Sequence, residues 1–376
     1  MKKNKQILFV NQSAGYLMID IIDAFKDEYE ERILLTGFLN PRNKKLDDSV
    51  KVEKLIAYDR TSSIKRIFTW FFAFIKALIL IKFKYPKAHL FLVSNPPFTS
   101  WIPFFCKNSY DILVYDIYPD AFVEFGYFKK DSWIIKKWES TNRKVYGKAR
   151  KISTITHGMQ ERLTKYVSKD RVDVVPIWTD NSFLKPIPKS ENIFLKTHQI
   201  EDKFIVMYSG NMGKAHPVEI LVQLAMHFKN NTAVFFLLIG GGDKYSDLEA
   251  QIIKIKLRNI KIMPWQDTSI LPLTLSGADL ALVTVGNEAS DLSIPSKTYN
   301  LMSVGTPILC VAPPNAALAK LVVSEKIGVV FQNEDLLSMI NFIEKSVNET
   351  EFLLNFRSNS LKASLNYTSE NAKQFN

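Results

Sequence analysis

Short apolar runs recur along the chain, and each is followed by a stretch whose apolar residues repeat with helical spacing. In the first half the predicted strands are residues 6–10, 32–35, 89–94, 112–116, 151–156 and 172–177. The predicted helices between them are residues 16–25, 64–83, 132–146 and 158–167. The strands are continuous apolar runs, which is typical of parallel strands covered on both faces. Their alternation with helices predicts an α/β fold with a doubly wound sheet.

The alternation begins again after residues 178–202, a mixed polar stretch with Pro186 and Pro188 that we interpret as an interdomain linker. The second set of predicted strands is 204–209, 233–240, 260–263, 280–285, 307–312 and 328–332, with helices at 217–229, 246–256, 296–303, 316–324 and 335–347. We therefore predict two Rossmann-like domains, residues 1–180 and 181–355. A helical tail, 356–376, is expected to return toward the first domain. Ligands of open parallel sheets bind beyond the carboxyl ends of the strands, so function is expected in the loops there.

Composition agrees with two folded domains, because the 376 residues are 47% hydrophobic and 23% charged. The two cysteines, Cys106 and Cys310, stand far apart, which argues against a disulfide framework or a cysteine metal site. The net charge of +11 lies in the first half: residues 1–180 hold 31 Lys and Arg against 20 Asp and Glu, and residues 181–376 hold 18 of each. Such a basic domain attracts phosphates of nucleic acid or of lipid head groups. A generally basic proteome would give the same excess.

Residues 64–83 form the longest apolar segment. Lys76 interrupts it and basic residues flank both ends, so we predict a membrane-surface helix or a buried helix and not a span. The basic start of the chain leads only into the short apolar run 7–10, which we interpret as a first strand and not as a secretion signal. A lysine stripe at Lys137, Lys144, Lys148 and Lys151 is typical of a solvated helix face, or of a membrane face beside this segment.

A glycine-containing loop in the second half predicts a diphosphate cradle. It reads YSGNMGKAHP over residues 208–217, where Gly210 and Gly213 permit close approach and Lys214 supplies a positive charge after a strand end. Asn211 and His216 belong to the same loop. The spacing matches neither a Walker loop nor a dinucleotide fingerprint, which disfavours nucleotide hydrolysis and dinucleotide binding. A plain turn remains the alternative.

Two later strand ends add candidates. Gly241 and Gly242 belong to the run IGGGD, which indicates a backbone that must pass close to another group. Trp265 follows the next strand and is placed either to wall a nucleobase or to pack between domains.

The most informative segment is DLSIPSKTYNLMSVGTPIL, residues 291–309. Ser296 is predicted as an N-cap or first-turn residue of a short helix, and Gly305 as its C-cap. Lys297 would then face the same crevice as Lys214, and Asp291, in the preceding loop, would accept sugar hydroxyls.

The first domain offers a loop and two single residues. Residues 11–15 connect a strand to a helix and suit an anion or a simple turn. Asp116, at a strand end, is the leading candidate for an acid–base or acceptor-orienting group, and His157 is the alternative. A lone Asp or His at a strand end is more often a cap than a catalytic residue.

The run PSKTYNLMSVGTPIL, residues 295–309, resembles the donor-site segment of the retaining GT-B glycosyltransferases of family 4, and most of all bacterial capsule and O-antigen sugar transferases. Further runs occur in the family's order, namely SNPPF at 94–98, YDIYPDAF at 115–122, VVPIWTDNSFLKP at 174–186, YSGNMGKAH at 208–216, IGGGD at 239–243 and GADLALVTV at 277–285. The resemblance covers nearly the whole chain. It implies a GT-B fold whose two domains face a crevice, retention of the anomeric configuration, and no metal or other cofactor.

The chain departs from the family at several positions. The family commonly has an Arg and a Lys after the first strand of the second domain, where this chain has Asn211 and His216. The family's two glutamates map onto Leu292 and Asn300, so neither is present. Asp291 is one place from the first and would replace it in function, and Asn300 would bond a ribose hydroxyl as a neutral partner. These departures leave the nucleotide and the sugar of the donor open.

The residues expected to bind the donor are Gly210, Asn211, Gly213, Lys214, His216, Gly241, Gly242, Trp265, Asp291, Ser293, Ser296, Lys297 and Asn300. Those expected at the acceptor are Asn11, Ser13, Gly15, Asn95, Asp116 and His157. Among these, Asp116, Lys214 and Lys297 are the predicted catalytic residues, and no residue is predicted to bind a metal.

The sequence therefore predicts a glycosyltransferase that moves a sugar from a nucleoside-diphosphate donor, expected to be UDP-linked, to a polyprenyl-diphosphate-linked saccharide. Lys214 and Lys297 would stabilise the leaving diphosphate, as a metal does elsewhere. We expect a cytoplasmic protein, peripheral on an anionic membrane surface at the inner face of the plasma membrane, in bacterial surface polysaccharide synthesis.

Two alternatives stay open. A sugar-nucleotide 2-epimerase shares the architecture, but it would need several carboxylates or histidines for proton abstraction, and the sequence offers few. A basic nucleic-acid-binding protein would explain the charge, but no recognition motif supports it, and we expect no nucleic-acid partner.

Overall fold

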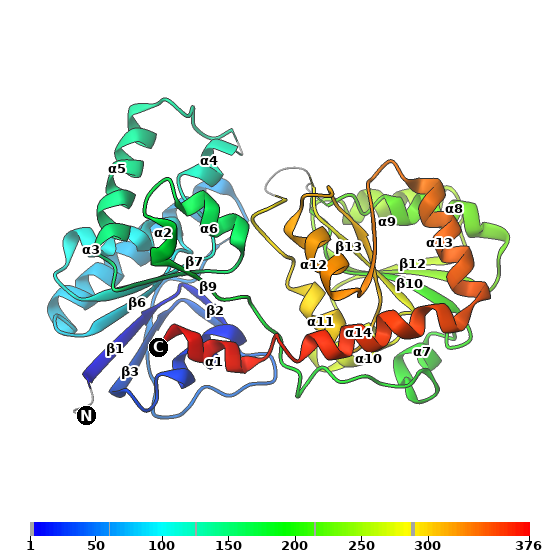
Figure 1. Ribbon diagram of the computed structural model, residues 1–376, viewed down its shortest axis with the longest axis horizontal. Helices are drawn as coiled ribbons and strands as arrows, with labels where there is room; N and C mark the ends of the chain where they lie inside the picture. Colours follow the sequence, from blue (N-terminus) through cyan, green and yellow to red (C-terminus); the bar gives the residue numbers. More distant parts are fainter. Residues whose placement is uncertain (1–3, 60, 125, 214–215, 287–289) are drawn as a thin grey trace. The chain divides into compact units, whose positions relative to one another are not determined.

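The computed structural model describes residues 4–59, 61–124, 126–213, 216–286 and 290–376, and the chain folds into two units (Figure 1). Unit 1 comprises Met1–Ile177 together with Ser369–Asn376, and unit 2 comprises Trp178–Thr368. Each unit is built on its own parallel sheet. The predicted fold class, with two doubly wound parallel-sheet domains, is confirmed.

The seven-stranded sheet of unit 1 has the order β5-β3-β1-β6-β7-β8-β9, and its neighbouring strands run parallel. Its strands are β1 (Asn4–Val10), β3 (Tyr29–Thr36), β5 (Lys51–Lys54), β6 (His89–Val93), β7 (Tyr110–Val114), β8 (Lys151–Thr154) and β9 (Val172–Val174). A separate short pair joins β2 (Ser13–Gly15) to β4 (Phe38–Asn40). Every residue of β6 and β7 is buried, which explains their continuous apolar sequences.

The helices of unit 1 are α1 (Tyr16–Ala24), α2 (Ser63–Ile79), α3 (Ile102–Phe105), α4 (Asp120–Glu124), α5 (Trp133–Lys148) and α6 (His157–Leu163). Shorter turns are the π-helical η1 (Leu80–Lys84) and the 3-10 segments η2 (Pro97–Trp101), η3 (Lys169–Arg171) and η8 (Ser369–Phe375). The last of these packs on unit 1: the ring of Phe375 meets that of Phe91 at 5.9 Å, and Asn376 Nδ2 donates to the Ala24 carbonyl at 2.8 Å.

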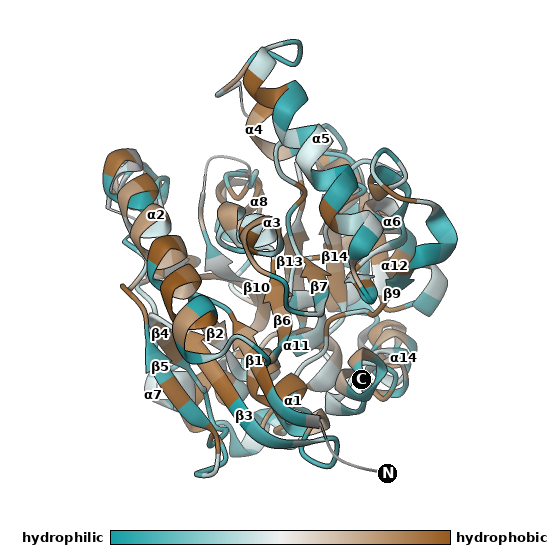
Figure 2. Ribbon diagram, turned by 90° about the vertical axis from the view of Figure 1, so that its left-hand side faces the viewer, coloured by the Kyte–Doolittle hydropathy of each residue, from teal (hydrophilic) through white to brown (hydrophobic). Residues whose placement is uncertain are grey.

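Helix α2 carries apolar side chains on its exposed face as well as on its buried one. Ala73 and Ala77 are buried, whereas Ile64, Phe68 and Phe71 are 81%, 57% and 49% exposed. Figure 2 shows the helix in the colour of hydrophobic residues over most of its length. Among the residues that the structure describes, no helix is both long enough and apolar enough to cross a membrane.

In unit 1 an ion cluster around the buried Asp111 joins β6 and β7 to Arg150, two residues after the end of α5. Asp111 accepts a hydrogen bond from His89 Nε2 at 2.9 Å and two from Arg150, at 3.0 and 2.6 Å. Burial by itself would raise the pKa of Asp111, but the hydrogen bonds from His89 and Arg150 outweigh it and hold that pKa below the usual value. The cluster therefore holds Asp111 as a charged, paired carboxylate.

The six-stranded sheet of unit 2 has the order β12-β11-β10-β13-β14-β15, again with parallel neighbours. Its strands are β10 (Phe204–Asn211), β11 (Val234–Gly241), β12 (Ile260–Met263), β13 (Leu280–Thr284), β14 (Ile308–Val311) and β15 (Gly328–Phe331). Numbered within the sheet, this is the order 3-2-1-4-5-6 of nucleotide-binding doubly wound folds.

The helices of unit 2 are α7 (Ile193–Thr197), α8 (Ile220–His227), α9 (Tyr245–Lys254), α10 (Leu271–Ser276), α11 (Lys297–Ser303), α12 (Ala317–Glu325), α13 (Leu336–Asn348) and α14 (Leu354–Ser364). Short 3-10 turns are η4 (Lys189–Glu191), η5 (Phe228–Asn230), η6 (Thr268–Ile270) and η7 (Thr350–Leu353). Helix α14 packs on α11 and α12 and belongs to unit 2, so residues 369–376 are the part of the tail that belongs to unit 1.

The stretch 178–202, which we interpreted as a linker, is folded onto unit 2. Trp178 and Leu184 are fully buried there. Asn192 caps α7 by accepting from the Leu195 N–H at 3.2 Å, and its side-chain amide donates to the Leu273 carbonyl at 2.8 Å. Prolines and polar residues had suggested an extended connection, but these contacts are made by single buried residues that composition does not distinguish.

Candidate active site

The strand order of unit 2 places a topological switch point between β10 and β13. The chain leaves β10 toward β11 on one side, whereas β13 to β15 lie on the other side. The loops after the two central strands therefore diverge, which leaves the crevice in which doubly wound folds bind their ligands.

Lys297, the first residue of α11, lies at this edge and has no acidic partner among the described residues. Its Nζ lies 3.7 Å from the centroid of the Tyr208 ring, and a Cβ added at Gly210 would come within 2.4 Å of the same nitrogen. Burial lowers the pKa of Lys297 to about 7. The face of the Tyr208 ring attracts a cation, but it cannot neutralise one. A desolvated ammonium without a carboxylate is a site prepared for an anion.

The glycines at the ends of β10 and β11 are explained by contacts within the chain. Gly210 has a φ of +147°, which L side chains rarely adopt, and a Cβ at Gly240 would lie 1.9 Å from the carbonyl oxygen of Gly210. A Cβ at Gly241 would lie 2.8 Å from Nε1 of Trp265, whose side chain is otherwise 62% exposed. The backbone of the IGGGD run therefore passes close to Gly210, at the end of β10, and to the Trp265 side chain.

Asn211, the last residue of β10, is exposed, and its side chain lies close to two of the loop glycines. A Cβ at Gly242 would lie 2.5 Å from its Oδ1, and one at Gly213 would lie 2.9 Å from its Nδ2. The Asn211 amide thus limits the space at both glycines.

His216 lies half-buried beside Lys297, and its Nδ1 is 3.5 Å from Thr284 Oγ1. Burial lowers the pKa of His216, and the nearby charge of Lys297 lowers it further, so the neutral imidazole is favoured. Lys214, which the sequence placed in the same cradle, lies outside the described residues. Lys297 is therefore the cation that the structure places at the switch point.

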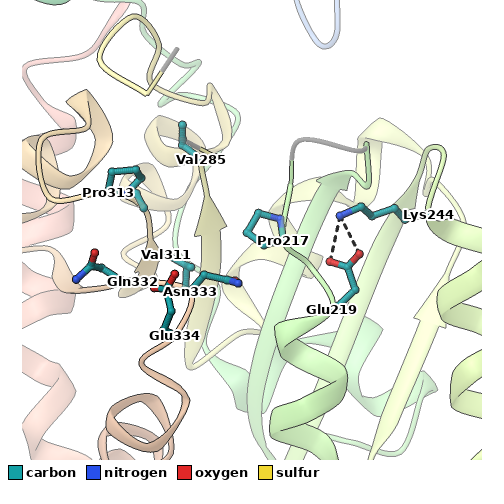
Figure 3. A pocket seen from close by; sticks show the side chains of 11 residues that line it. Pro217, Glu219, Lys244, Val285, Val311, Pro313, Gln332, Asn333 and Glu334 are labelled. Atoms are coloured by element: carbon teal, nitrogen blue, oxygen red, sulfur yellow. Dashed lines mark hydrogen bonds and ion pairs between the residues drawn. The ribbon is translucent and has the colours of Figure 1, made fainter. Parts of the chain in front are cut away.

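A cavity of about 360 Å³ opens at the carboxyl ends of the strands, a volume that suits a small-molecule ligand (Figure 3). Lys244 lies on one side and bonds both to Glu219, at 2.8 Å, and to the His216 carbonyl oxygen, at 2.7 Å. Gln332 and Glu334 lie on the other side, after β15. The lining residues are Pro217, Glu219, Lys244, Val285, Gly286, Val311, Ala312, Pro313, Gln332, Asn333 and Glu334.

The polar residues of this cavity are not among those expected from the sequence. Lys244 and Glu334 each stand a few residues beyond a strand end, where ligands of parallel sheets bind. Glu219 carried no such signal, because it lies in a turn that leads into α8. Pro217 was expected inside that helix but precedes it.

The remaining donor candidates occupy different environments. Ser296 stands at the N-cap position of α11, but it has helical dihedral angles and its side chain makes no capping hydrogen bond. Gly305, with a φ of +74°, ends the helix as predicted. Asn300 is buried, and its Oδ1 accepts from Thr179 Oγ1 at 2.6 Å. The loop residues Asp291 and Ser293 are half-buried and exposed, respectively.

In unit 1 the structure brings two of the six acceptor candidates into one cavity. Asn95 and Asp116 both line a space of about 660 Å³, and burial raises the pKa of Asp116. Asn11 instead accepts from the Ser13 backbone N–H at 3.2 Å, next to Gly15 at the start of α1. His157 is exposed at the start of α6, with Nδ1 3.4 Å from the side-chain oxygen of Gln160.

No family model matches the chain. The curated relatives that it matches include WbjE of Pseudomonas aeruginosa, named as a probable glycosyltransferase, at 23% identity over 62% of this chain and 58% of that protein. WcaI of Escherichia coli (strain K12), named as a candidate colanic acid biosynthesis glycosyl transferase, is 28% identical over 45% of this chain and 42% of that protein. The chain thus spans about half the length of the curated relatives it matches.

Solved structures resemble the chain over nearly its full length. HepE of Anabaena, solved in complex with UDP-glucose, has a TM-score of 0.71 at 15% identity and covers 99% of this chain and 98% of that one. WaaG, a glycosyltransferase involved in lipopolysaccharide biosynthesis, has a TM-score of 0.70 at 13% identity, with 98% of each chain covered. Sucrose-phosphate synthase of Thermosynechococcus elongatus has a TM-score of 0.70 at 15% identity and covers 99% and 97%. The fold is therefore that of the GT-B glycosyltransferases.

Proposed function

We propose that this protein is a glycosyltransferase that takes a sugar from a nucleoside-diphosphate donor bound at the β10–β13 switch point of unit 2. The observation that carries the proposal is Lys297. Its ammonium is desolvated, it lies against Gly210 and the Tyr208 ring, and no described carboxylate pairs with it. A diphosphate would supply the missing negative charge.

The similar proteins support this proposal from two sides. The curated relatives carry glycosyltransferase names, and one of them is named for colanic acid biosynthesis. HepE, which shares the fold, was solved with UDP-glucose, with UDP and glucose, and with UDP. UDP is accordingly the nucleotide that we propose for the donor here, although the donor sugar stays open.

We propose transfer with retention of the anomeric configuration and without a metal, which is what the resemblance to family 4 implies. In such a reaction the departing diphosphate takes the proton of the acceptor hydroxyl on the same face of the sugar. The enzyme then has to stabilise the negative charge that grows on the leaving group. Lys297 is positioned for that role among the described residues, and Lys214 is assigned to it from the sequence alone.

The proposed acceptor is a polyprenyl-diphosphate-linked saccharide at an anionic membrane surface. The basic excess of the chain lies in unit 1, which holds 32 Lys and Arg against 20 Asp and Glu. The exposed side chains of α2 include Ile64, Phe68 and Phe71, and a lipid surface would bury them. A place on the inner face of the plasma membrane, in the synthesis of a surface polysaccharide, would fit both features.

The first experiment is a thermal-shift screen of the purified chain with UDP, GDP and CDP. A nucleotide present at a hundredfold its dissociation constant stabilises a protein by about 2.7 kcal/mol, which is readily detected. We expect UDP to raise the melting temperature most. If none of the three has an effect at millimolar concentration, the donor proposal is wrong.

The reaction and the membrane are tested separately. Proton NMR of the product made from an α-linked UDP-sugar should give the coupling of an α-linkage, and an inverted product would exclude retention. Incubation of the donor without acceptor should give no epimerised sugar nucleotide, which distinguishes the transferase from a 2-epimerase.

Flotation with anionic and neutral vesicles should give salt-sensitive binding to the anionic ones alone. Stronger binding to RNA or DNA under the same salt conditions would count against the membrane.

A further inference from the structure

The cavity of about 660 Å³ in unit 1 differs in chemistry from the cavity of about 360 Å³ in unit 2. Most of its lining is aromatic, including Trp70 of α2, Phe98 of η2, Phe122 of α4 and Trp138 of α5. Its volume is within the range of cavities that hold a small molecule. The aromatic residues come from four separate helical segments, so packing within one element does not explain why the rings face a common space.

Polar groups enter the same cavity from the edge of the sheet. Asn95 and Asp116 follow the paired strands β6 and β7, at the carboxyl edge where parallel sheets bind ligands. No hydrogen bond or ion pair from the described side chains reaches the Asp116 carboxylate. Buried polar groups in proteins are normally paired, so the Asp116 carboxylate indicates a missing polar partner at this end of the cavity.

One wall of the cavity is shared with the exposed apolar face of α2. Ile67 and Trp70 line the cavity, while Phe68 and Phe71 of the same helix are 57% and 49% exposed. A lipid surface that covers the outer face of α2 would thus lie one helix away from the cavity. The occupant is therefore expected to be drawn from a membrane, with an apolar part that suits the aromatic walls.

We propose that this cavity binds the junction of a polyisoprenoid acceptor, with its first isoprene units among the aromatic rings and its phosphate-bearing head at Arg66 and Asn95. The inference rests on the proposed function. It adds that the start of the lipid chain leaves the bilayer and binds within the protein. Methyl-branched, unsaturated units present flat apolar faces to aromatic rings.

The test is binding of farnesyl monophosphate, a soluble isoprenoid phosphate, to the full chain, measured by calorimetry below its micelle concentration. Dodecyl phosphate and glucose 1-phosphate serve as matched probes, the first with a straight chain and the second with a sugar in place of the chain. We expect farnesyl monophosphate to bind at least tenfold more tightly than either. Equal binding of the dodecyl probe would overturn the isoprenoid assignment, and tighter binding of glucose 1-phosphate would make this a saccharide site.

A cavity-filling substitution gives the second measurement. Ala121→Trp adds a ring at a lining position without leaving a void, and it should lower the affinity for farnesyl monophosphate at least tenfold. Phe71→Gln, on the outer face of α2, is the matched control and should weaken vesicle binding while leaving farnesyl binding unchanged. Unchanged farnesyl binding in Ala121→Trp would place the ligand elsewhere and end the proposal. UDP binding is measured on every variant, so a failure of the donor proposal is seen separately from a failure of this one.

Discussion

Replacing Lys297 with methionine should make the protein more stable and at the same time weaken its binding of UDP. The two effects have one cause, because the ammonium that would meet the diphosphate is desolvated and without an acidic partner in the described residues. Methionine keeps the length and most of the packing of the lysine side chain but removes its charge.

The size of the stability change follows from the pKa. The folded value of about 7 against the usual 10.5 corresponds to roughly 4–5 kcal/mol against the charged form, at 1.36 kcal/mol for each pKa unit. The contact with the Tyr208 ring offsets about 1–2 kcal/mol of this. We therefore expect Lys297→Met to raise the stability of unit 2 by roughly 2–4 kcal/mol at pH 6.5.

The stability gain should depend on pH in a set direction. Below pH 7 Lys297 is protonated in both the folded and the unfolded chain, so the destabilisation by the buried charge is fully present. Between pH 7 and about 10.5 the unfolded chain holds one more proton, so the stability of the wild-type protein rises with pH. The advantage of Lys297→Met should therefore shrink as the pH is raised from 6.5 to 9.5.

UDP affinity should change in the opposite sense. Hydrogen bonds to charged groups are worth about 1.5–3 kcal/mol, so Lys297→Met should weaken binding roughly ten- to hundredfold at pH 6.5. Wild-type affinity should fall as the pH rises above 7, because less of the lysine is protonated. UDP itself also binds protons as the pH changes. Subtracting the pH dependence of UDP affinity in Lys297→Met from that in the wild type removes this contribution.

The measurements are urea unfolding and calorimetric UDP titration at both pH values. Lys254→Met is the matched control, because Lys254 is an exposed lysine of α9 in the same unit and should change neither quantity much. A Lys297→Met protein that is less stable at pH 6.5 and binds UDP like the wild type would refute the reasoning on both counts.

Three further predictions use other parts of the molecule. Gly210→Ala should weaken UDP binding about as much as Lys297→Met, because the added Cβ would displace the lysine nitrogen. Gly147→Ala is the control, because a Cβ added there meets nothing, and this variant should bind UDP normally in the same titration. Asp111→Ala should destabilise unit 1 by about 3–5 kcal/mol in urea unfolding, and a loss under 1 kcal/mol would mean that its buried ion cluster contributes little. Asp116→Asn should keep measurable transferase activity and lose less than Lys297→Ala, and a dead Asp116→Asn enzyme with an inverted product would make Asp116 the catalytic base.

The sequence predicted the two sheets well because their central strands are buried on both faces. In β6, β7 and β13 every residue is buried, so each appears as a continuous apolar run. Strand β5, with the sequence KVEK, carries charged residues at an edge of the sheet and gave no such signal. The pair β2–β4 consists of three-residue strands, which are too short for a periodic pattern to be recognised.

The candidate site was predictable where a local rule applies and not where contacts are long-range. Strand ends followed by glycine pointed to Gly210, and the capping pattern around α11 pointed to Lys297, and the structure brings these two together. The bond between Thr179 and Asn300 joins positions far apart in the chain, so no local rule predicts it. The same holds for the aromatic cavity, whose rings are scattered over residues 58–138.

The lowered pKa of Lys297 also bears on how the proposed reaction would proceed without a metal. At neutral pH the free protein carries this lysine in both charge states, so a bound diphosphate would itself draw a proton onto it. The attraction then strengthens as the bond to the sugar breaks, because the diphosphate gains negative charge only in that step. An interaction that is stronger in the transition state than in the bound donor raises the rate. An interaction of equal strength in both states would only tighten binding. The low-dielectric surroundings that destabilise Lys297 in the free protein are thus what would make it effective on the departing diphosphate.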